Sequence, residues 1–255
     1  MINPMDYPLL VFVLSFAALW VSSRLGVLII EKRRPLEEDM RHDLGVVLTA
    51  TLTLLGLIIG FTFSMAVSRY DQRKNLEEAE ANAIGTEYVR ADLMPAAEAA
   101  KVRALLREYT DQRILYYQTR DREQVKKIDA RTMQLQNQLW SVVAGFAAEK
   151  RDPVSALVVA GMNDVLNSQG YTQAAWWNRI PIAAWILMAG IAICCNVLFG
   201  YGTHNLKAGG SLRLVLPIVF STAFFLIADI DSPRGGVIRV GAQNLVALAE
   251  SLKSP

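Results

Sequence analysis

Apolar and polar residues are segregated along this chain of 255 residues. Roughly 20 apolar residues are needed to cross a bilayer core of ~30 Å, and four runs approach or exceed that length. They are Leu9–Ile30, Leu44–Ser68, Ile180–Tyr201 and Leu214–Ala228. The second and third hold no charge, the first carries Arg24, whose side chain can snorkel toward headgroups, and the fourth is short and contains Pro217. The pattern predicts four transmembrane helices in a lipid bilayer.

The polar segment between the second and third runs, the module Arg69–Arg179, is rich in Ala, Glu, Gln, Arg and Leu, which favour helix. Pro95 and Pro153 stand where prolines open a helix. We expect the second span to continue as a helix to about Leu93, followed by helices near 95–119, 121–150 and 153–169. No strand pattern of any length appears. The prediction is an all-α membrane protein divided into residues 1–68, 69–179, 180–230 and a tail, 231–255.

An even number of crossings places both termini and the module on one side of the membrane. Basic residues near the spans are almost balanced between the two sides, with a small excess on the side of the module over the loop Glu31–Asp43. Because basic residues favour the cytoplasmic side, we expect a cytoplasmic module in a multi-pass protein of the cell membrane. Trp176, Trp177 and Tyr201 flank the third run as interfacial aromatic residues do.

Composition and candidate chemistry argue against several classes of function. Lys plus Arg number 26 against 24 acids, a net charge of +2, so nucleic acid is not an expected partner. The two cysteines are adjacent and predict neither a disulfide nor a thiolate metal site. His42 and His204 lie in the two short loops without the spaced partners of a metal or catalytic site, and Glu77, Glu78 and Glu80 are expected to form a solvated face. We therefore predict no enzyme activity, no cofactor and no metal.

The second span carries a stripe of small and hydroxyl residues. At 100° per residue they fall within an arc of about 100°. Beyond the membrane, polar residues continue the same arc. The stripe consists of Gly45, Thr49, Thr53, Gly56, Gly60 and Ser64, then Asp71, Lys74, Glu78, Asn82 and Gly85, with Phe63 and Val67 as its only sizeable apolar side chains.

Two interpretations of this stripe stay open. Gly56 and Gly60 form a G-x-x-x-G pair, which lets another helix approach closely. Alternatively the stripe lines a water-filled path, in which Phe63 and Val67 form a hydrophobic constriction that closes by dewetting. In the first span, a shorter stripe that ends at Gly26 favours helix packing.

The fourth span runs into the stretch IADIDSPRGG, Ile227 to Gly236, whose proline and paired glycines indicate that the helix ends. One interpretation is that Asp231 or Ser232 caps a following helix and that an aspartate pairs with Arg234. A second is a gating or subunit contact formed by Asp229, Asp231 and Arg234. A metal site is the third.

Four segments together resemble a family of membrane proteins called bestrophin-like. They are GFTFSMAVSRYDQRK from Gly60, EEAEANAIGTEYVRADLMP from Glu77, LREYTDQR from Leu106 and IADIDSPRGGVIRV from Ile227. The resemblance covers essentially the whole chain, and Glu-Ala-Asn-Ala-Ile-Gly-Thr, Glu80–Thr86, is its most specific part. The name points to the bestrophins, which are pentameric anion channels with the second span lining the pore.

The resemblance thus implies a homo-oligomer, a pentamer as in bestrophins, that conducts inorganic anions. Only Asp229 and Asp231 remain of the acidic calcium clasp of bestrophins, and a calcium ion needs six or more oxygens, so calcium activation is not expected. The alternative function is a membrane-anchored scaffold or sensor that conducts nothing and whose module binds a partner.

Overall fold

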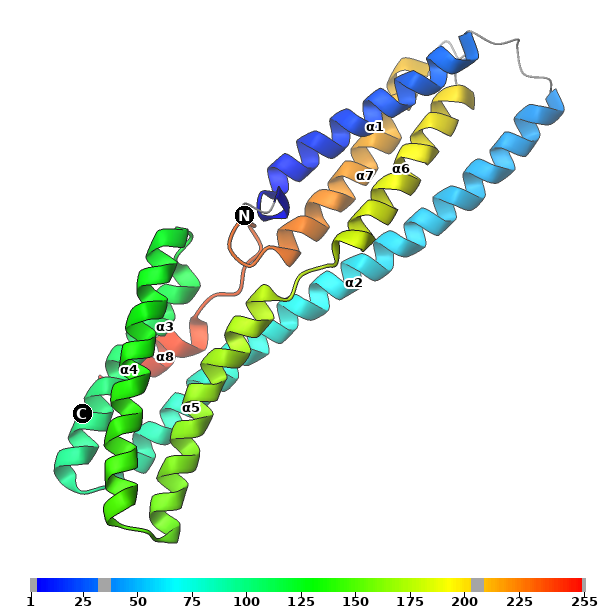
Figure 1. The fold of residues 1–255 in the computed structure, drawn as a ribbon. Helices are drawn as coiled ribbons and strands as arrows, with labels where there is room; N and C mark the ends of the chain where they lie inside the picture. The colour runs from blue at the N-terminus through cyan, green and yellow to red at the C-terminus, as the bar shows by residue number, and fades with distance from the viewer. Residues whose placement is uncertain (1–3, 32–37, 203–208, 254–255) are drawn as a thin grey trace. The chain divides into compact units, whose positions relative to one another are not determined.

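The computed structural model describes residues 4–31, 38–202 and 209–253, and every regular element in these ranges is a helix. The predicted all-α fold is confirmed, and Figure 1 shows the course of the chain. In chain order the elements are η1 (Pro4–Asp6), α1 (Pro8–Glu31), α2 (Glu38–Arg90), η2 (Ala91–Leu93), α3 (Ala96–Gln118), α4 (Arg122–Glu149), α5 (Pro153–Trp177), α6 (Ile182–Gly202), α7 (Gly209–Asp231) and α8 (Gln243–Ser251).

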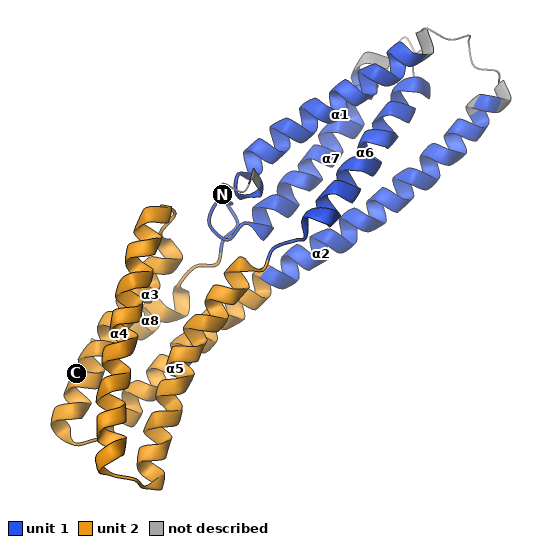
Figure 2. Ribbon diagram, in the orientation of Figure 1, with its two compact units in different colours: residues 1–69, 179–239 blue, residues 70–178, 240–255 orange. Residues whose placement is uncertain are grey.

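The chain divides into two compact units (Figure 2). Unit 1 comprises Met1–Arg69 and Arg179–Arg239, and unit 2 comprises Tyr70–Asn178 and Val240–Pro255. Unit 1 holds α1, α6, α7 and the first part of α2, and unit 2 holds the rest of α2 with α3, α4, α5 and α8. Helix α2 is therefore common to both units.

Within the described residues, four helices are long and apolar enough to cross a membrane, and they correspond to the four predicted spans. Helix α7 extends beyond the predicted fourth span at both ends, has 23 residues and contains Pro217 in its interior. At 1.5 Å per residue this length is about 35 Å, which suffices for a crossing. A proline within a membrane helix is tolerated where neighbouring groups compensate for the lost hydrogen bond.

Helices α1 and α6 approach each other closely at two glycines. A Cβ atom on Gly26 would collide with the backbone carbonyl of Val197, and one on Gly200 would collide with the carbonyl of Ser23. Gly26 therefore serves packing between helices, as its stripe predicts. Small residues at such crossings let backbones come within van der Waals contact.

Helix α2 has 53 residues and no break near Ser68, in agreement with the prediction. It ends at Arg90, and the three residues to Leu93 form the tighter η2 turn. The prediction that His42 lies in a loop is wrong, since α2 already begins at Glu38. His204 lies outside the described residues.

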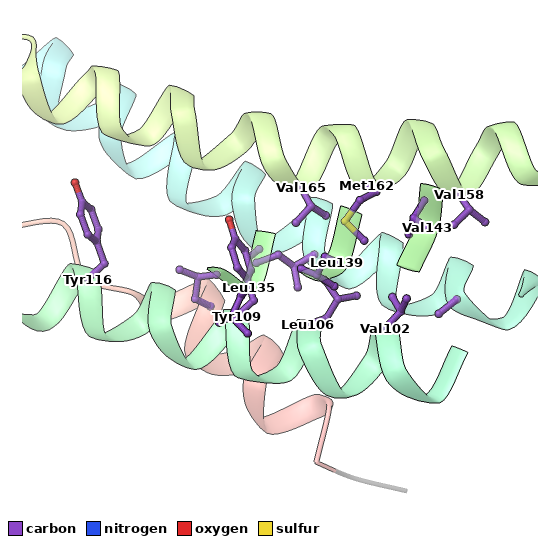
Figure 3. Close-up of a cluster of buried hydrophobic side chains, with 14 of the residues drawn as sticks. Val102, Leu106, Tyr109, Tyr116, Leu135, Leu139, Val143, Val158, Met162 and Val165 are labelled. Atoms are coloured by element: carbon purple, nitrogen blue, oxygen red, sulfur yellow. The ribbon is translucent and has the colours of Figure 1, made fainter. Parts of the chain in front are cut away.

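Unit 2 is a helical module around one apolar core (Figure 3). Leu106 and Tyr109 of α3, Leu135 and Leu139 of α4 and Met162 of α5 are all fully buried in it. Helices α3 and α4 agree with the predicted ranges to within one residue. The module therefore has the core of an independently packed domain.

Helix α5 continues to Trp177, well beyond the predicted end near residue 169. The reason is tertiary packing: Trp176 is buried, and its ring centroid lies 5.0 Å from that of Tyr116 and 5.4 Å from that of Tyr117. The prediction of Trp176 as an interfacial residue is thus wrong, because its ring belongs to the core of the module. Trp177 remains 73% exposed.

The predicted tail contains a helix that the sequence analysis missed. Helix α8 has nine residues, and Leu245 and Ala249 on one of its faces are buried in unit 2. Its shortness hides the helical periodicity in the sequence, since nine residues make only two and a half turns.

Candidate functional site

The stripe on α2 is open to the surroundings in the single chain. All the predicted lining residues are exposed except Val67, which is half-buried. The exposed ones are Thr49, Thr53, Gly56, Gly60, Phe63 and Ser64 in unit 1, and Asp71, Lys74, Glu78 and Asn82 in unit 2.

No described side chain or backbone of this chain covers the stripe glycines of the membrane region, whereas Gly85 in unit 2 lies against the Leu248 side chain of α8. A Cβ atom built on Gly45, Gly56 or Gly60 would have no atom within 4 Å. Thr49 and Thr53 donate their hydroxyl hydrogens to helix carbonyls one turn earlier, at 2.8 and 2.9 Å. The Gly56–Gly60 pair thus does not pack a helix of its own chain, and its hydroxyl neighbours tolerate an apolar setting.

Helix α2 presents two other faces within the membrane region. Leu55, Thr62 and Ala66 form the face that is buried within the chain. A third face holds large exposed apolar side chains, of which Leu54 and Phe61 are 48% and 63% exposed. At 100° per residue this third face begins just beyond the stripe, and Leu54 lies about 130° from the stripe's centre. Small, bulky and buried positions are therefore separated around one helix.

Beyond the membrane region, the charged residues of α2 also divide into an exposed set and a buried set. Asp71, Lys74 and Glu78 continue the exposed stripe. Glu77 and Glu80 are 1% and 0% exposed. The expectation that they share a solvated face with Glu78 is therefore wrong. At 100° per residue Glu80 lies about 150° from the stripe's centre and Glu77 about 90°, where other elements of unit 2 cover both side chains.

Glu80 lies in a buried polar cluster. Its carboxylate accepts a hydrogen bond from Arg113 Nε of α3, and Thr172 Oγ1 of α5 lies 3.2 Å and Tyr117 Oη 3.4 Å away. Both partners of the ion pair have no exposed side-chain surface. The Arg113 guanidinium also lies 4.5 Å from the Tyr116 ring centre, a cation–π distance. One carboxylate of α2 thus joins α3 and α5 to this helix.

Glu77 holds the C-terminal helix. Its Oε1 accepts a hydrogen bond of 2.9 Å from the backbone N–H of Leu245, in the first turn of α8. Its Oε2 accepts one of 2.6 Å from Asn244 Nδ2. The first N–H groups of a helix have no partner within it, and no side chain of the N-cap residue, Ala242, supplies one. Glu77 supplies this cap from a distant part of the chain.

The stretch IADIDSPRGG forms a tight return of the chain after α7. The Asp229 carboxylate accepts two hydrogen bonds of 2.8 Å, from the backbone N–H groups of Val237 and Ile238. Ser232 Oγ accepts one of 3.0 Å from the N–H of Gly235. Asp229 therefore fixes the loop that follows the last span.

Asp231 serves α6, the helix before α7 in the chain. It accepts a hydrogen bond of 3.2 Å from the backbone N–H of Ile180, two residues before α6 begins. The interpretation that Asp231 or Ser232 caps a following helix is wrong, because α8 starts only at Gln243. Asp231 instead accepts from Ile180 because the end of α7 lies beside the start of α6.

Asp231 and three other charged residues form one cluster. Arg179 donates to the Asp6 carboxylate, and its Nη1 donates to the Asp231 carbonyl oxygen at 2.6 Å. Nη1 of Arg69 and Nη1 of Arg179 each lie 3.7 Å from an Asp231 carboxylate oxygen. Asp6 precedes α1, Arg69 belongs to α2, Arg179 precedes α6, and Asp231 is the last residue of α7. One ion cluster therefore joins the same ends of all four spans.

Asp6, Arg69 and Arg179 were not predicted as members of this cluster, because nothing in their local sequence signals partners so far along the chain. Among the described residues, no three His, Cys, Asp or Glu side chains lie close enough to hold a metal ion. Arg234 is half-buried. A gating or subunit contact by Asp229, Asp231 and Arg234 stays a prediction, since it requires a second chain.

Comparison with known proteins gives a consistent result. Residues 9–245 match the family model described as Bestrophin-like domain. A variant of a bacterial bestrophin homologue from Klebsiella pneumoniae has a similar structure, with a TM-score of 0.65, 13% sequence identity, and coverage of 94% of this chain and 96% of that chain. A second variant has a TM-score of 0.65 and 12% sequence identity, with coverage of 94% of this chain and 93% of that chain. A further structure of the homologue has a TM-score of 0.63 and 13% identity, with coverage of 94% of this chain and 95% of that chain. No curated protein sequence matches the chain. At this identity the solved structures show a shared fold.

Proposed function

The chain belongs to the bestrophin-like family of membrane proteins, and we propose that it is an oligomeric channel-like protein whose ion path is lined by α2. The observation that carries the proposal is the open stripe, on which a Cβ atom at Gly56 or Gly60 would meet no atom of the described chain within 4 Å. A face of small and hydroxyl residues suits close contact with another helix or with water. The stripe leads directly to Asp71, Lys74 and Glu78, which are exposed and need water.

A ring of identical subunits accounts for all three faces of α2. The buried face packs within each subunit, the bulky face with Leu54 and Phe61 meets lipid or a neighbouring subunit, and the stripe faces the axis. A homo-oligomer with closed symmetry repeats every stripe residue around that axis. We take a pentamer and inorganic anions from the resemblance to bestrophins, and a cytoplasmic position for the module from the basic residues beside the spans.

Phe63 and Val67 would form the narrow part of this path. Phe63 is 40% exposed and Val67 is half-buried, so both reach the stripe surface. Repeated around a symmetry axis, they form an apolar collar in which water is unstable, and such a collar closes a pore without a charged gate.

The test is ion flux into liposomes that contain the purified protein. We expect the double variant Phe63→Ala, Val67→Ala to raise basal flux, because it widens the collar. Leu54→Ala is the matched control, since it removes an exposed apolar side chain outside the stripe and should leave flux unchanged. Chloride and potassium gradients, applied separately, identify the permeant ion, and native mass spectrometry gives the number of subunits.

The alternative, a scaffold or sensor that conducts nothing, predicts a different outcome. If the stripe only packs helices, the double variant leaves a void and lowers the free energy of unfolding by ~3–5 kcal/mol without a gain in flux. Unchanged flux together with lost thermal stability would end the assignment of α2 as a pore helix. Protease accessibility of the module in sealed vesicles of known orientation tests its cytoplasmic position.

A further inference from the structure

Glu87 of α2 is a buried carboxyl group without a hydrogen-bond partner. Its exposed fraction is 0%, and neither carboxyl oxygen has a partner within hydrogen-bond distance. It lies about 19 residues beyond Ser68, roughly 28 Å further along the helix at 1.5 Å per residue, so it belongs to the module. An ionised carboxylate in such a place is costly, and burial favours its neutral form.

A glycine of α5 makes room for this side chain. A Cβ atom on Gly161 would collide with Glu87 Oε2 and with the side chain of Arg90. Glu87 thus lies directly against the α5 backbone, in a notch that any other residue at position 161 would fill. Glycine within a helix costs about 1 kcal/mol relative to alanine, which is consistent with a packing reason for its presence here.

Two charged side chains influence the Glu87 carboxyl group, Arg90 on its own helix and Asp164 on α5. Arg90 follows it on α2, and its Nη1 lies 3.4 Å from the carbonyl oxygen of Leu157 on α5. Asp164 is exposed on α5. Burial raises the pKa of the Glu87 carboxyl group to about 8, while the charge of Arg90 lowers this pKa and the charge of Asp164 raises it. The carboxyl group therefore keeps its proton at neutral pH as long as it stays in the notch.

We propose that Glu87 is a proton-controlled switch between α2 and α5. The protonated side chain packs in the notch at Gly161. When the proton leaves, the carboxylate attracts the Arg90 side chain that borders the same notch. The paired side chains move toward water, which withdraws Arg90 from the Leu157 carbonyl and loosens α5 from α2. The packed state binds the proton and the loosened state releases it.

The switch itself does not depend on the proposed channel function, although its consequence for transport does. Helix α2 carries the stripe in its membrane part, so a change in how α5 holds α2 would reach the proposed ion path. If α2 lines a pore, flux through the wild-type protein should depend on pH, and flux through Glu87→Gln should lose that dependence.

Hydrogen–deuterium exchange of the full-length protein in detergent tests the switch. Exchange of peptides that cover residues 154–168, corrected for the intrinsic effect of pH, should rise between pH 5.5 and 8 and level off above it. The limiting slope is roughly tenfold per pH unit, because loosening is coupled to the loss of one proton. This measurement needs no substitution, and a corrected exchange rate that is independent of pH overturns the proposal.

Two variants locate the effect. Glu87→Gln keeps the shape of the neutral side chain and should abolish the rise, whereas Glu149→Gln, at an exposed glutamate of α4, should keep the wild-type profile. A wild-type profile in Glu87→Gln would overturn the assignment to this residue. Absence of flux at every pH, with the exchange profile as expected, would refute the channel and leave the switch intact.

Discussion

The buried ion pair between Glu80 and Arg113 should be the most sensitive point of the module. Both side chains have no exposed surface, and they join α2 to α3. Arg113→Met would leave the Glu80 carboxylate without its positive partner, with the hydroxyl groups of Thr172 and Tyr117 at 3.2 and 3.4 Å as its hydrogen-bond partners among the described residues. Glu80→Gln would leave the guanidinium facing a neutral amide and the Tyr116 ring. Either change strands a charge in a site with no exposed side-chain surface.

Removing one partner of a buried ion pair typically costs 3–5 kcal/mol, so we expect each single variant to lose ~3–5 kcal/mol of stability. For a chain of this size about 2–4 °C of melting temperature corresponds to 1 kcal/mol, which gives a decrease of roughly 6–20 °C. The double variant removes both charges. It should lose less than either single variant, because no charge remains stranded.

Thermal unfolding of the detergent-solubilised protein, followed by circular dichroism, measures these differences. The matched control is Arg131→Met, because Arg131 pairs with Glu108 between α3 and α4 while their side chains are 39% and 44% exposed. An exposed pair contributes about 0–1 kcal/mol, so this variant should melt within a few degrees of the wild type.

Losses of the two single variants that add up in the double variant would contradict a coupled buried ion pair. Additivity would mean that Glu80 and Arg113 stabilise the module independently of each other. A loss for Arg113→Met no larger than that for Arg131→Met would also contradict it, since burial is the feature that separates the two pairs.

Three further predictions concern packing, capping and pH. Gly200→Ala should destabilise the protein by ~1–3 kcal/mol in thermal unfolding, because its Cβ would meet a backbone carbonyl of α1, whereas Gly190→Ala on the same helix has open space and should be neutral or slightly stabilising. Glu77→Gln weakens the cap on the Leu245 N–H, so proteolysis near the C-terminus should become faster, and an unchanged rate would contradict the cap. Hydrogen bonds from Ser155 lower the pKa of Asp152 to about 2, below its usual 3.8. Its contribution to stability should therefore be complete above about pH 4 and lost as the pH falls toward 2, and Asp152→Asn should flatten this part of the melting profile.

Local patterns in the sequence were sufficient for most of the fold. The spans followed from apolar length, and α3 and α4 followed from helix-favouring residues between clear start and stop signals. The continuity of α2 beyond Ser68 followed from the absence of proline. These properties depend on neighbours within a few residues, which a single sequence displays directly.

The candidate site was only partly accessible to the same reasoning. Helical periodicity places Gly56, Gly60 and Phe63 on one face, and all three are exposed in the chain. Periodicity did not reveal that Glu77 and Glu80 lie on a covered face, because polar residues occupy both sides of α2 beyond the membrane. A helical projection gives the angle between two residues but not the identity of what packs against them.

Tertiary structure alone decided which charges are paired and which helices they join. The cap from Glu77 to Leu245 spans 168 positions, and the bond from Arg179 to Asp6 spans 173. The pairing of Asp231 with the start of α6 likewise depends on how the helices of unit 1 pack. A carboxylate gains a buried partner only where folding brings a distant donor to it and removes the water between them, and neither condition is written in the residues beside it.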